Sequence, residues 1–140
     1  IPYAAGCIGV AIKAQEMALQ YVPQRETFGA PLSSRQSIQW MLVDNDIDIK
    51  QSTWITLEAA SKAAKGESFR KEAAMAKLVA TEAGGRVVDR CMQMFGGLGV
   101  AKDLPFERWF REMRIRRIGE GPSEVQRHVI ARELLGSSLR

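Results

Sequence analysis

Cysteine is scarce in this sequence of 140 residues, which contains only Cys7 and Cys91. Two cysteines so far apart fit no metal-binding spacing, and they cannot form the disulfide framework that stabilises small secreted domains. The alternative is that both are reduced thiols in a core or at an interface. Reduced thiols suit the cytoplasm of a bacterium or the mitochondrial matrix.

Long apolar runs are also absent, and no stretch approaches the roughly 20 residues that a membrane-spanning helix needs. The composition, 46% hydrophobic and 26% charged, is that of an ordinary globular domain with its own core. The chain begins at Ile1, already inside an apolar pattern and without an initiator methionine. We therefore expect residues 1–140 to form a single domain of a longer protein.

Several residue patterns of catalytic and nucleotide-binding sites are missing. The one histidine, His128, lies within a helical pattern and has no cysteine or carboxylate set around it. We therefore expect a surface or half-buried histidine and no metal site. The glycines of residues 96–99 form no GxGxxG motif and follow a helix rather than a strand, which excludes a Rossmann site. By themselves they indicate the end of a helix.

The formal net charge is only +4, but five arginines fall within residues 108–117. Glu107 and Glu112 are interleaved with them, which is typical of a solvated helix face. The alternative is a site for phosphates or for an acidic partner. Nucleic acid is not expected, because the aromatic residues here have the spacing of a helix core rather than of a stacking platform. The arginines are Arg108, Arg111, Arg114, Arg116 and Arg117.

Glycine and proline divide the chain into helical blocks, and no stretch shows the alternation of a strand. Pro23 should kink or stop the first helix, and residues 28–31 should form a loop. Ser33 or Ser34 can cap the second helix, and Pro122 takes the first-turn position of the last. The expected helices cover about 3–25, 34–66, 70–95, 105–114 and 122–135.

Short connections make antiparallel neighbours, so the predicted fold is an all-α, up-and-down four-helix bundle with a short extra helix. One face of the third helix carries small residues that let another helix come close. This face and the apolar sides of the first two helices exceed what one bundle needs to cover, which predicts a homodimer or homotetramer. The small-face residues are Ala73, Ala76, Ala80, Ala83 and Val87.

Two short segments combine residues that could carry chemistry. Glu120 stands directly before a helix N-terminus, where a carboxylate is either a capping device or a functional group. Gly121 lets another group approach the backbone. Arg25, followed by Phe28, could provide a bidentate phosphate fork and an aromatic face, or equally a salt bridge and a core aromatic. By itself, neither segment shows whether its residues have a functional or only a structural role.

Five motifs spread along the chain are specific when taken together. Residues 21–29 read YVPQRETFG and are followed by Gln36, and residues 76–78 read AKL. Residues 93–99 read QMFGGLG, and residues 104–108 read LPFER, followed by Arg111. Residues 118–127 read IGEGPSEVQR, followed by IAREL at 130–134. In content and order, these motifs resemble the C-terminal domain of acyl-CoA dehydrogenases over nearly the whole chain.

The resemblance implies that the domain builds the subunit interface and half of an FAD site. Arg25 and Phe28 would reach the FAD of a neighbouring subunit, with Arg25 at the pyrophosphate and Gln36 assisting. Gln93 and Gly97 would hold the adenosine-diphosphate part. All the cofactor-binding residues implied in this way are Arg25, Phe28, Gln36, Gln93, Gly96, Gly97, Pro122 and Glu124.

The same resemblance makes Glu120 the base that removes the α-proton of an acyl-CoA, while the β-hydrogen leaves as hydride to FAD and a trans-2-enoyl-CoA forms. The N–H of Glu120 would hydrogen-bond the thioester carbonyl and stabilise the developing negative charge. Gly119 and Gly121 would complete the substrate contacts. Electrons would pass to an electron-transfer flavoprotein, and no metal, membrane or nucleic acid is implied.

Three positions depart from the family pattern. Pro122 replaces the usual threonine and so lacks a hydroxyl and an N–H that normally meet the flavin. Gly119 stands where many members have a tyrosine beside the acyl chain, which predicts a wider site for branched or ring-bearing acyl groups. Pro23 interrupts the helix that carries Arg25.

The same residues leave other functions open, two of them enzymatic and one not. Some branches take their base from a glutamate near the start of the first helix, but that position would precede Ile1, and Glu120 is present. An acyl-CoA oxidase would share these residues. A non-catalytic helical oligomerisation module is the third alternative. The family's N-terminal helical domain and middle β-domain are absent from the sequence, so we expect the chain alone to be inactive.

Overall fold

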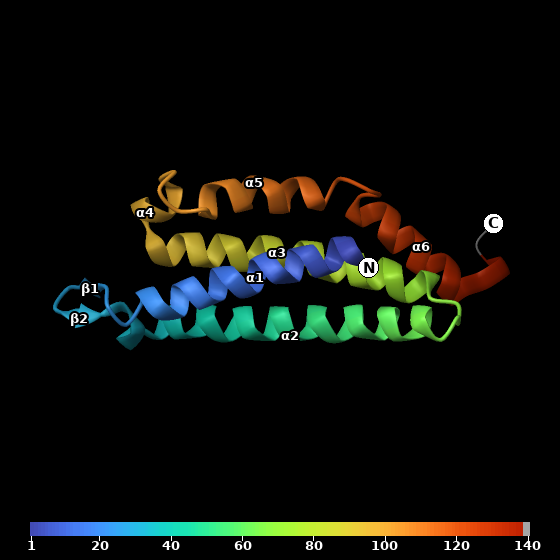
Figure 1. The fold of residues 1–140 in the computed structure, drawn as a ribbon, viewed down its shortest axis with the longest axis horizontal. Helices are drawn as coiled ribbons and strands as arrows, with labels where there is room; N and C mark the ends of the chain where they lie inside the picture. The colour runs from blue at the N-terminus through green and yellow to red at the C-terminus, as the bar shows by residue number, and fades with distance from the viewer. Residues whose placement is uncertain (139–140) are drawn as a thin grey trace.

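The computed structural model describes residues 1–138. Long antiparallel helices run along one axis, with α3 in contact with α1, α2, α5 and α6 (Figure 1). The predicted all-α bundle is confirmed. Its helices are α1 (Pro2–Tyr21), α2 (Gln36–Ala64), α3 (Arg70–Phe95), α4 (Gly97–Val100), α5 (Phe106–Arg116) and α6 (Ser123–Leu135), with 3-10 turns η1 (Leu32–Ser34) and η2 (Gly136–Ser138).

The fourth position of the bundle is filled by two helices rather than by one. α5 and α6 follow each other in a row that covers α3 (Figure 1). The sequence predicted the short helix as an addition to four long ones, whereas here it shares a row with the last helix. Residues 117–122 interrupt this row, and the interruption carries Glu120.

A small β-hairpin follows α1. Strand β1 (Glu26–Thr27) pairs antiparallel with β2 (Ala30–Pro31), and the turn residues Phe28 and Gly29 have φ values of 51° and 73°. Two successive positive φ values are what a tight type I′ hairpin turn requires. The sequence predicted only a loop here, because strands of two residues are too short to show an alternation.

The ends of two helices differ from prediction. α1 ends at Tyr21 instead of near residue 25, and Pro23 stops it rather than kinking it. Neither Ser33 nor Ser34 caps α2, because both lie in η1, and the N-cap residue is Arg35. The predicted end of the second helix before Gly66 and the bounds of α3 are confirmed.

Small side chains make the contact between α1 and α3. Gly84 lies where α1, α3 and α5 meet, because a Cβ atom there would lie 3.0 Å from Met113 Sδ on α5 and 3.5 Å from Cys7 Cβ on α1. The small face of α3 is therefore used inside the bundle and is not available for self-association as predicted. Its buried members face a matching set on α1, namely Ala4, Cys7, Ala11, Ala14 and Ala18.

Cys7 and Cys91 are both free and fully buried in this core. The prediction of core thiols is confirmed. Burial raises the pKa of Cys91 to about 12. A thiol in such surroundings stays protonated and chemically inert at neutral pH.

α2 turns a polar stripe toward the bundle interior. Asp48 accepts hydrogen bonds from Arg86 Nη2 at 2.5 Å and from Arg90 Nη1 at 2.7 Å, both on α3. Asn45 donates to Gln15 Oε1 on α1 at 2.9 Å. Burial alone would raise the pKa of Asp48, but the hydrogen bonds from Arg86 and Arg90 outweigh it and lower the pKa.

The opposite face of α2 is apolar and exposed. Its two tryptophans, Trp40 and Trp54, are 61% and 66% exposed. The residues recur at steps of three and four with Lys50 in one gap, which is the spacing of a coiled-coil seam. We call this set the α2 seam, and its members are Trp40, Val43, Ile47, Trp54 and Leu57.

Replacing the buried carboxylate of α2 should destabilise the bundle. Asp48→Asn leaves Arg86 and Arg90 without their charged acceptor and should lower the free energy of unfolding by about 2–3 kcal/mol at pH 7. Because folding lowers the pKa of Asp48, its stabilisation exists above the unfolded pKa of about 3.9 and disappears as pH falls through the folded value. The variant should therefore lose less stability on acidification than the wild type.

Urea unfolding from pH 7 to pH 3 measures both effects. Asp46→Asn, an exchange at an exposed carboxylate of the same helix, is the matched control and should change little. Equal costs for the two variants would contradict a special role for Asp48.

Candidate functional site

The loop between α5 and α6 has an unusual backbone. Glu120 has φ 53° and Gly121 has φ 87°. Residues other than glycine rarely adopt this left-handed region, so Glu120 is held there by its surroundings. The φ of Gly121 is one that glycine adopts without strain, and an added Cβ atom there would lie 2.6 Å from Gln126 Nε2, the end of a flexible side chain. The site begins with a strained, carboxylate-bearing turn.

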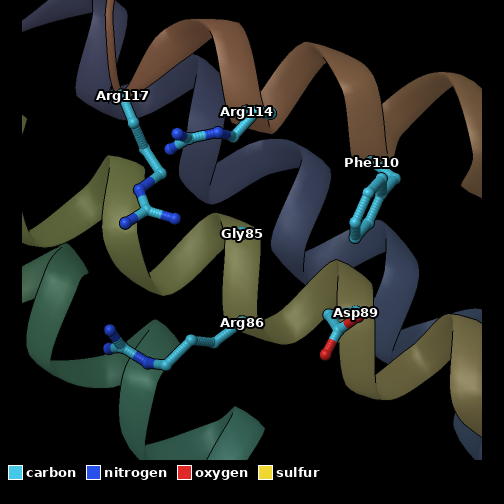
Figure 2. A pocket seen from close by; sticks show the side chains of 6 residues that line it. All are labelled: Gly85, Arg86, Asp89, Phe110, Arg114 and Arg117. Atoms are coloured by element: carbon cyan, nitrogen blue, oxygen red, sulfur yellow. The ribbon is translucent and has the colours of Figure 1, made fainter.

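Both ends of this loop are tied to one carboxylate on α3. Ser123 Oγ donates to Glu82 Oε1 at 2.6 Å, and Arg117 Nη2 lies 2.7 Å from Glu82 Oε2. Figure 2 shows Arg117 extending from the end of α5 toward α3. Burial would raise the pKa of Glu82, but the bonds from Ser123 and Arg117 lower it overall. Glu82 therefore stays ionised and anchors the loop.

The centre of the loop is held at the carbonyl of Gly121. Lys77 Nζ, from α3, donates to this oxygen at 2.7 Å. Gln126 Nε2, from α6, donates to the same oxygen at 3.0 Å and to the Glu120 carbonyl at 3.3 Å. Pro122 is the N-cap residue of α6 rather than a residue of its first turn, so the helix begins at Ser123, one residue later than predicted. Glu124 is exposed in the first turn.

Glu120 is exposed and borders a cavity of about 590 Å³ between α1, α3 and α6. The lining combines apolar surface with hydrogen-bonding groups, as is common for small-molecule sites. Besides Glu120 it includes Tyr3, Phe69, Ala73, Lys77, Gln126 and Val129.

The space beside Gly119 is occupied. A Cβ atom at Gly119 would lie 3.0 Å from the hydroxyl of Tyr3, which comes from α1. The guanidinium of Arg116 lies 5.0 Å and the ammonium of Lys77 5.8 Å from the centroid of the Tyr3 ring, within cation–π range. The hydroxyl of Tyr3 therefore borders the space that Gly119 leaves, and the wider acyl site stays a prediction.

A second cavity, of about 400 Å³, lies at the other end of the bundle. Exposed Arg25 borders it together with Gly96 and Gly97, where an added Cβ would meet no atom within 4 Å. The rings of Tyr21 and Phe95, which also line it, stack with centroids 4.1 Å apart. The cavity thus offers a cation, open backbone and an aromatic surface.

Three further predicted cofactor residues lie near this end without lining the cavity, whereas Pro122 and Glu124 lie at the start of α6. Phe28 stands at the tip of the hairpin and is 99% exposed, which rules out its alternative as a core aromatic. Gln36 is the exposed first residue of α2, and Gln93 is exposed in the last turn of α3. The hairpin, α4 and the end of α3 are gathered here (Figure 1).

The predicted site residues therefore form two groups at opposite ends of the bundle. Lys77, beside Glu120, and Gln93 both lie on α3, and their separation along the helix is about 24 Å at 1.5 Å per residue. A single copy does not bring Arg25 to Glu120.

The arginine-rich segment is largely committed to internal contacts. Arg108 and Arg111 pair with Glu112 and Glu107 on the surface of α5. These pairs favour the solvated-face interpretation. A cavity of about 260 Å³ lies between α3 and α5. Figure 2 shows that Arg114, which lines it, points toward Arg117.

His128 is exposed on α6. Within residues 1–138, no cluster of three or more histidine, cysteine or acidic residues is placed to bind a metal ion. None of the helices described is both long enough and apolar enough to cross a membrane.

Comparison with known proteins identifies the fold family. Residues 1–135 match the model of the acyl-CoA dehydrogenase C-terminal domain. The chain belongs to the acyl-CoA dehydrogenase family. Over 137 residues it is 42% identical to the mitochondrial short-chain specific acyl-CoA dehydrogenase of Bos taurus, covering 98% of this chain and 33% of that protein. It is 37% identical to cyclohexane-1-carbonyl-CoA dehydrogenase of Geobacter metallireducens, covering 94% and 34%.

Solved structures of the family superpose closely on this acyl-CoA dehydrogenase domain. Butyryl-CoA dehydrogenase from Megasphaera elsdenii matches with a TM-score of 0.92 and 38% identity, over 95% of this chain and 35% of that chain. The FAD complex of PigA matches with a TM-score of 0.90 and 27% identity, over 94% and 34%. The chain thus spans about a third of the length of these relatives.

Sequence reasoning missed roles for Lys77 and Tyr3. Lys77 falls in register with the buried positions Ala74, Ala80 and Gly84 of α3, and a lysine at a core position of a helix is a signal that could have been noticed. Nothing in the sequence pairs Tyr3 with Gly119, because the contact joins the two ends of the chain.

Proposed function

We propose that this domain belongs to a flavin-dependent acyl-CoA dehydrogenase in which Glu120 removes the α-proton of an acyl-CoA thioester. The observation that carries the proposal is the Glu120 turn, which is strained, fixed to α3 and open to a cavity of about 590 Å³. Backbone strain that surrounding contacts maintain is characteristic of functional sites. Membership of the family supports the same reaction.

Two groups of Glu120 have separate tasks in this reaction. Its exposed carboxylate takes the α-proton, which is too weakly acidic to be lost without a base held in position. Its N–H donates to the thioester carbonyl and stabilises the enolate-like charge. Among residues 1–138, no backbone carbonyl accepts a hydrogen bond from this N–H, which supports its role toward a ligand.

The second cavity fits the nucleotide end of FAD. Arg25 would hold the pyrophosphate by charge-assisted hydrogen bonds, and the open backbone at Gly96 and Gly97 admits the close approach of a phosphate or ribose. Gln93, Gln36 and Phe28 would add contacts around it. When bound, FAD supplies the acceptor for the β-hydrogen as hydride.

A complete site requires more than one copy of the chain. Arg25 and Glu120 lie at opposite ends of the bundle, so an FAD held by Arg25 serves the Glu120 of another subunit. The α2 seam is the surface that we assign to self-association, as a homodimer or homotetramer. Five exposed apolar side chains in coiled-coil spacing are typical of a surface that another helix covers.

The wider assignments rest on the relatives. We propose an acyl-CoA thioester as substrate and an electron-transfer flavoprotein as partner. The relatives include a mitochondrial protein and bacterial ones, which supports the mitochondrial matrix or the bacterial cytoplasm. The N-terminal helical domain and the middle β-domain of such an enzyme would come from outside this sequence.

Glu120→Gln tests the central proposal in the complete polypeptide loaded with FAD. Glutamine keeps the shape of the side chain but accepts no proton, so flavin reduction by acyl-CoA should slow by about three orders of magnitude or more while acyl-CoA still binds. Anaerobic stopped-flow absorbance reports this half-reaction without an electron acceptor. Glu58→Gln, at an exposed carboxylate on α2 that belongs to neither proposed site, is the control. Near wild-type bleaching by Glu120→Gln would remove Glu120 as the base.

Arg25→Ala tests the nucleotide site in the 140-residue chain. We expect the oligomeric wild type to bind ADP nearly as well as FAD, because its residues address the adenosine and pyrophosphate rather than the ring. Loss of the guanidinium should weaken ADP binding by about 1.5–3 kcal/mol in calorimetry. Arg132→Ala, on α6 at the other end of the bundle, should leave it unchanged. Absence of ADP binding by the wild type would count for a non-catalytic oligomerisation module.

Trp54→Glu tests the α2 seam. The wild-type chain should be a dimer or tetramer by light scattering at micromolar concentration, and an added negative charge within the seam should shift it toward monomer. Glu58→Gln, an exchange on the same helix outside the seam, should not. A monomeric wild type would contradict self-association.

A further inference from the structure

Lys77 carries an ammonium group into the bundle without a counter-ion. Its side chain lies at a position only 6% exposed, and no carboxylate of residues 1–138 lies within 4.0 Å of its nitrogen. Its hydrogen bond goes instead to the Gly121 carbonyl at 2.7 Å. By contrast, Lys62 at the end of α2 binds Glu72 directly at 2.5 Å. A buried charge without an ionic partner lowers the stability of the folded state. A protein that keeps such a group usually needs it for its function.

The surroundings of Lys77 connect it to the Glu120 turn. It borders the same cavity as Glu120 and lies against the ring of Tyr3. Burial lowers the pKa of Lys77, and the negative charges of Glu120, Glu82 and Glu124 oppose that effect. The ammonium therefore acts on the carboxylates around the loop as well as on the backbone.

We propose that Lys77 is a positioning residue for Glu120, whose left-handed turn it fixes to α3 through the carbonyl of Gly121. The proposal rests on the proposed function for the role of Glu120 as base. It extends that function by naming the group that aims both the carboxylate and the N–H of Glu120.

The geometry gives Lys77 a role that Gln126 cannot fill. Gln126 also donates to the Gly121 carbonyl, but it belongs to α6, which follows the loop directly and moves with it. Lys77 belongs to α3, the helix that every other long helix contacts. A charged donor forms a hydrogen bond about twice as strong as a neutral one. Lys77 thus ties the turn to the rigid part of the bundle.

Lys77→Met in the complete, FAD-loaded protein tests the proposal, because methionine keeps an unbranched side chain and removes the donor. Hydrogen exchange by mass spectrometry should show amides of residues 117–123 exchanging about tenfold faster, with α1 and α2 unchanged. Flavin reduction should slow about 10- to 100-fold while the Kd for the acyl-CoA changes less than about threefold, since a displaced base loses rate rather than binding.

Two further variants make the result specific. Lys62→Met removes a lysine contact to α3 away from the turn and should change neither the exchange of residues 117–123 nor flavin reduction. Lys77→Ala should behave as Lys77→Met does, and ethylammonium added to the solution should restore part of the rate by refilling the donor site. If Lys77→Met does not fold, Lys77→Gln, which keeps a shorter polar side chain, replaces it.

The outcomes separate this proposal from the proposed function. Unchanged loop exchange in the Lys77 variants overturns the positioning role whatever the activity. Faster exchange with an unchanged reduction rate shows that the contact does not aim the base, and it also overturns the proposal. If Glu120→Gln leaves flavin reduction intact, the proposed function fails, while the exchange measurement still decides whether Lys77 fixes the turn.

Discussion

The close contact between α1 and α3 is the constraint on which the rest of the bundle depends. Alanines on both helices and Gly84, where α1, α3 and α5 meet, set a short distance between the two backbones. That distance makes α3 the axis against which α2, α5 and α6 pack. It also places Lys77, at the edge of the contact, where its ammonium reaches the loop above. A larger residue at Gly84 would move α1 and α5 and would displace the loop with them.

α2 shows why periodicity alone does not identify the buried face of a helix. Its inward face carries Asp48, which meets two arginines of α3, beside apolar residues such as Ile38 and Ile49, and its outward face is also apolar. Paired buried charges contribute little net stability compared with apolar packing, but they are intolerant of a shift in register. The ion pairs fix the register of α2 on α3. The exposed apolar side of α2 can then contact a partner.

Much of the fold was predictable because its signals are local. Glycine and proline mark the ends of α1, α2 and α3. The small residues on one face of α3 indicate that another helix packs closely against it. The motif around Glu120 was recognisable in the same way. The contacts of Tyr3 with Gly119 and of Lys77 with Gly121 were not predictable, because they join distant parts of the chain. The hairpin at Phe28 was missed because its strands contain only two residues each.

The interruption between α5 and α6 has a consequence for the order of events in folding. α2 and α3 are joined by the short connection of residues 65–69 and pack on each other, so this pair can assemble from contacts close in sequence, which form quickly. Residues 117–123 gain their unusual backbone only after α3 is in place, since their anchors Lys77 and Glu82 lie on it. Both anchors stand more than 40 residues earlier in the chain. The carboxylate of Glu120 thus lies in a segment whose backbone is ordered by contacts between distant parts of the chain.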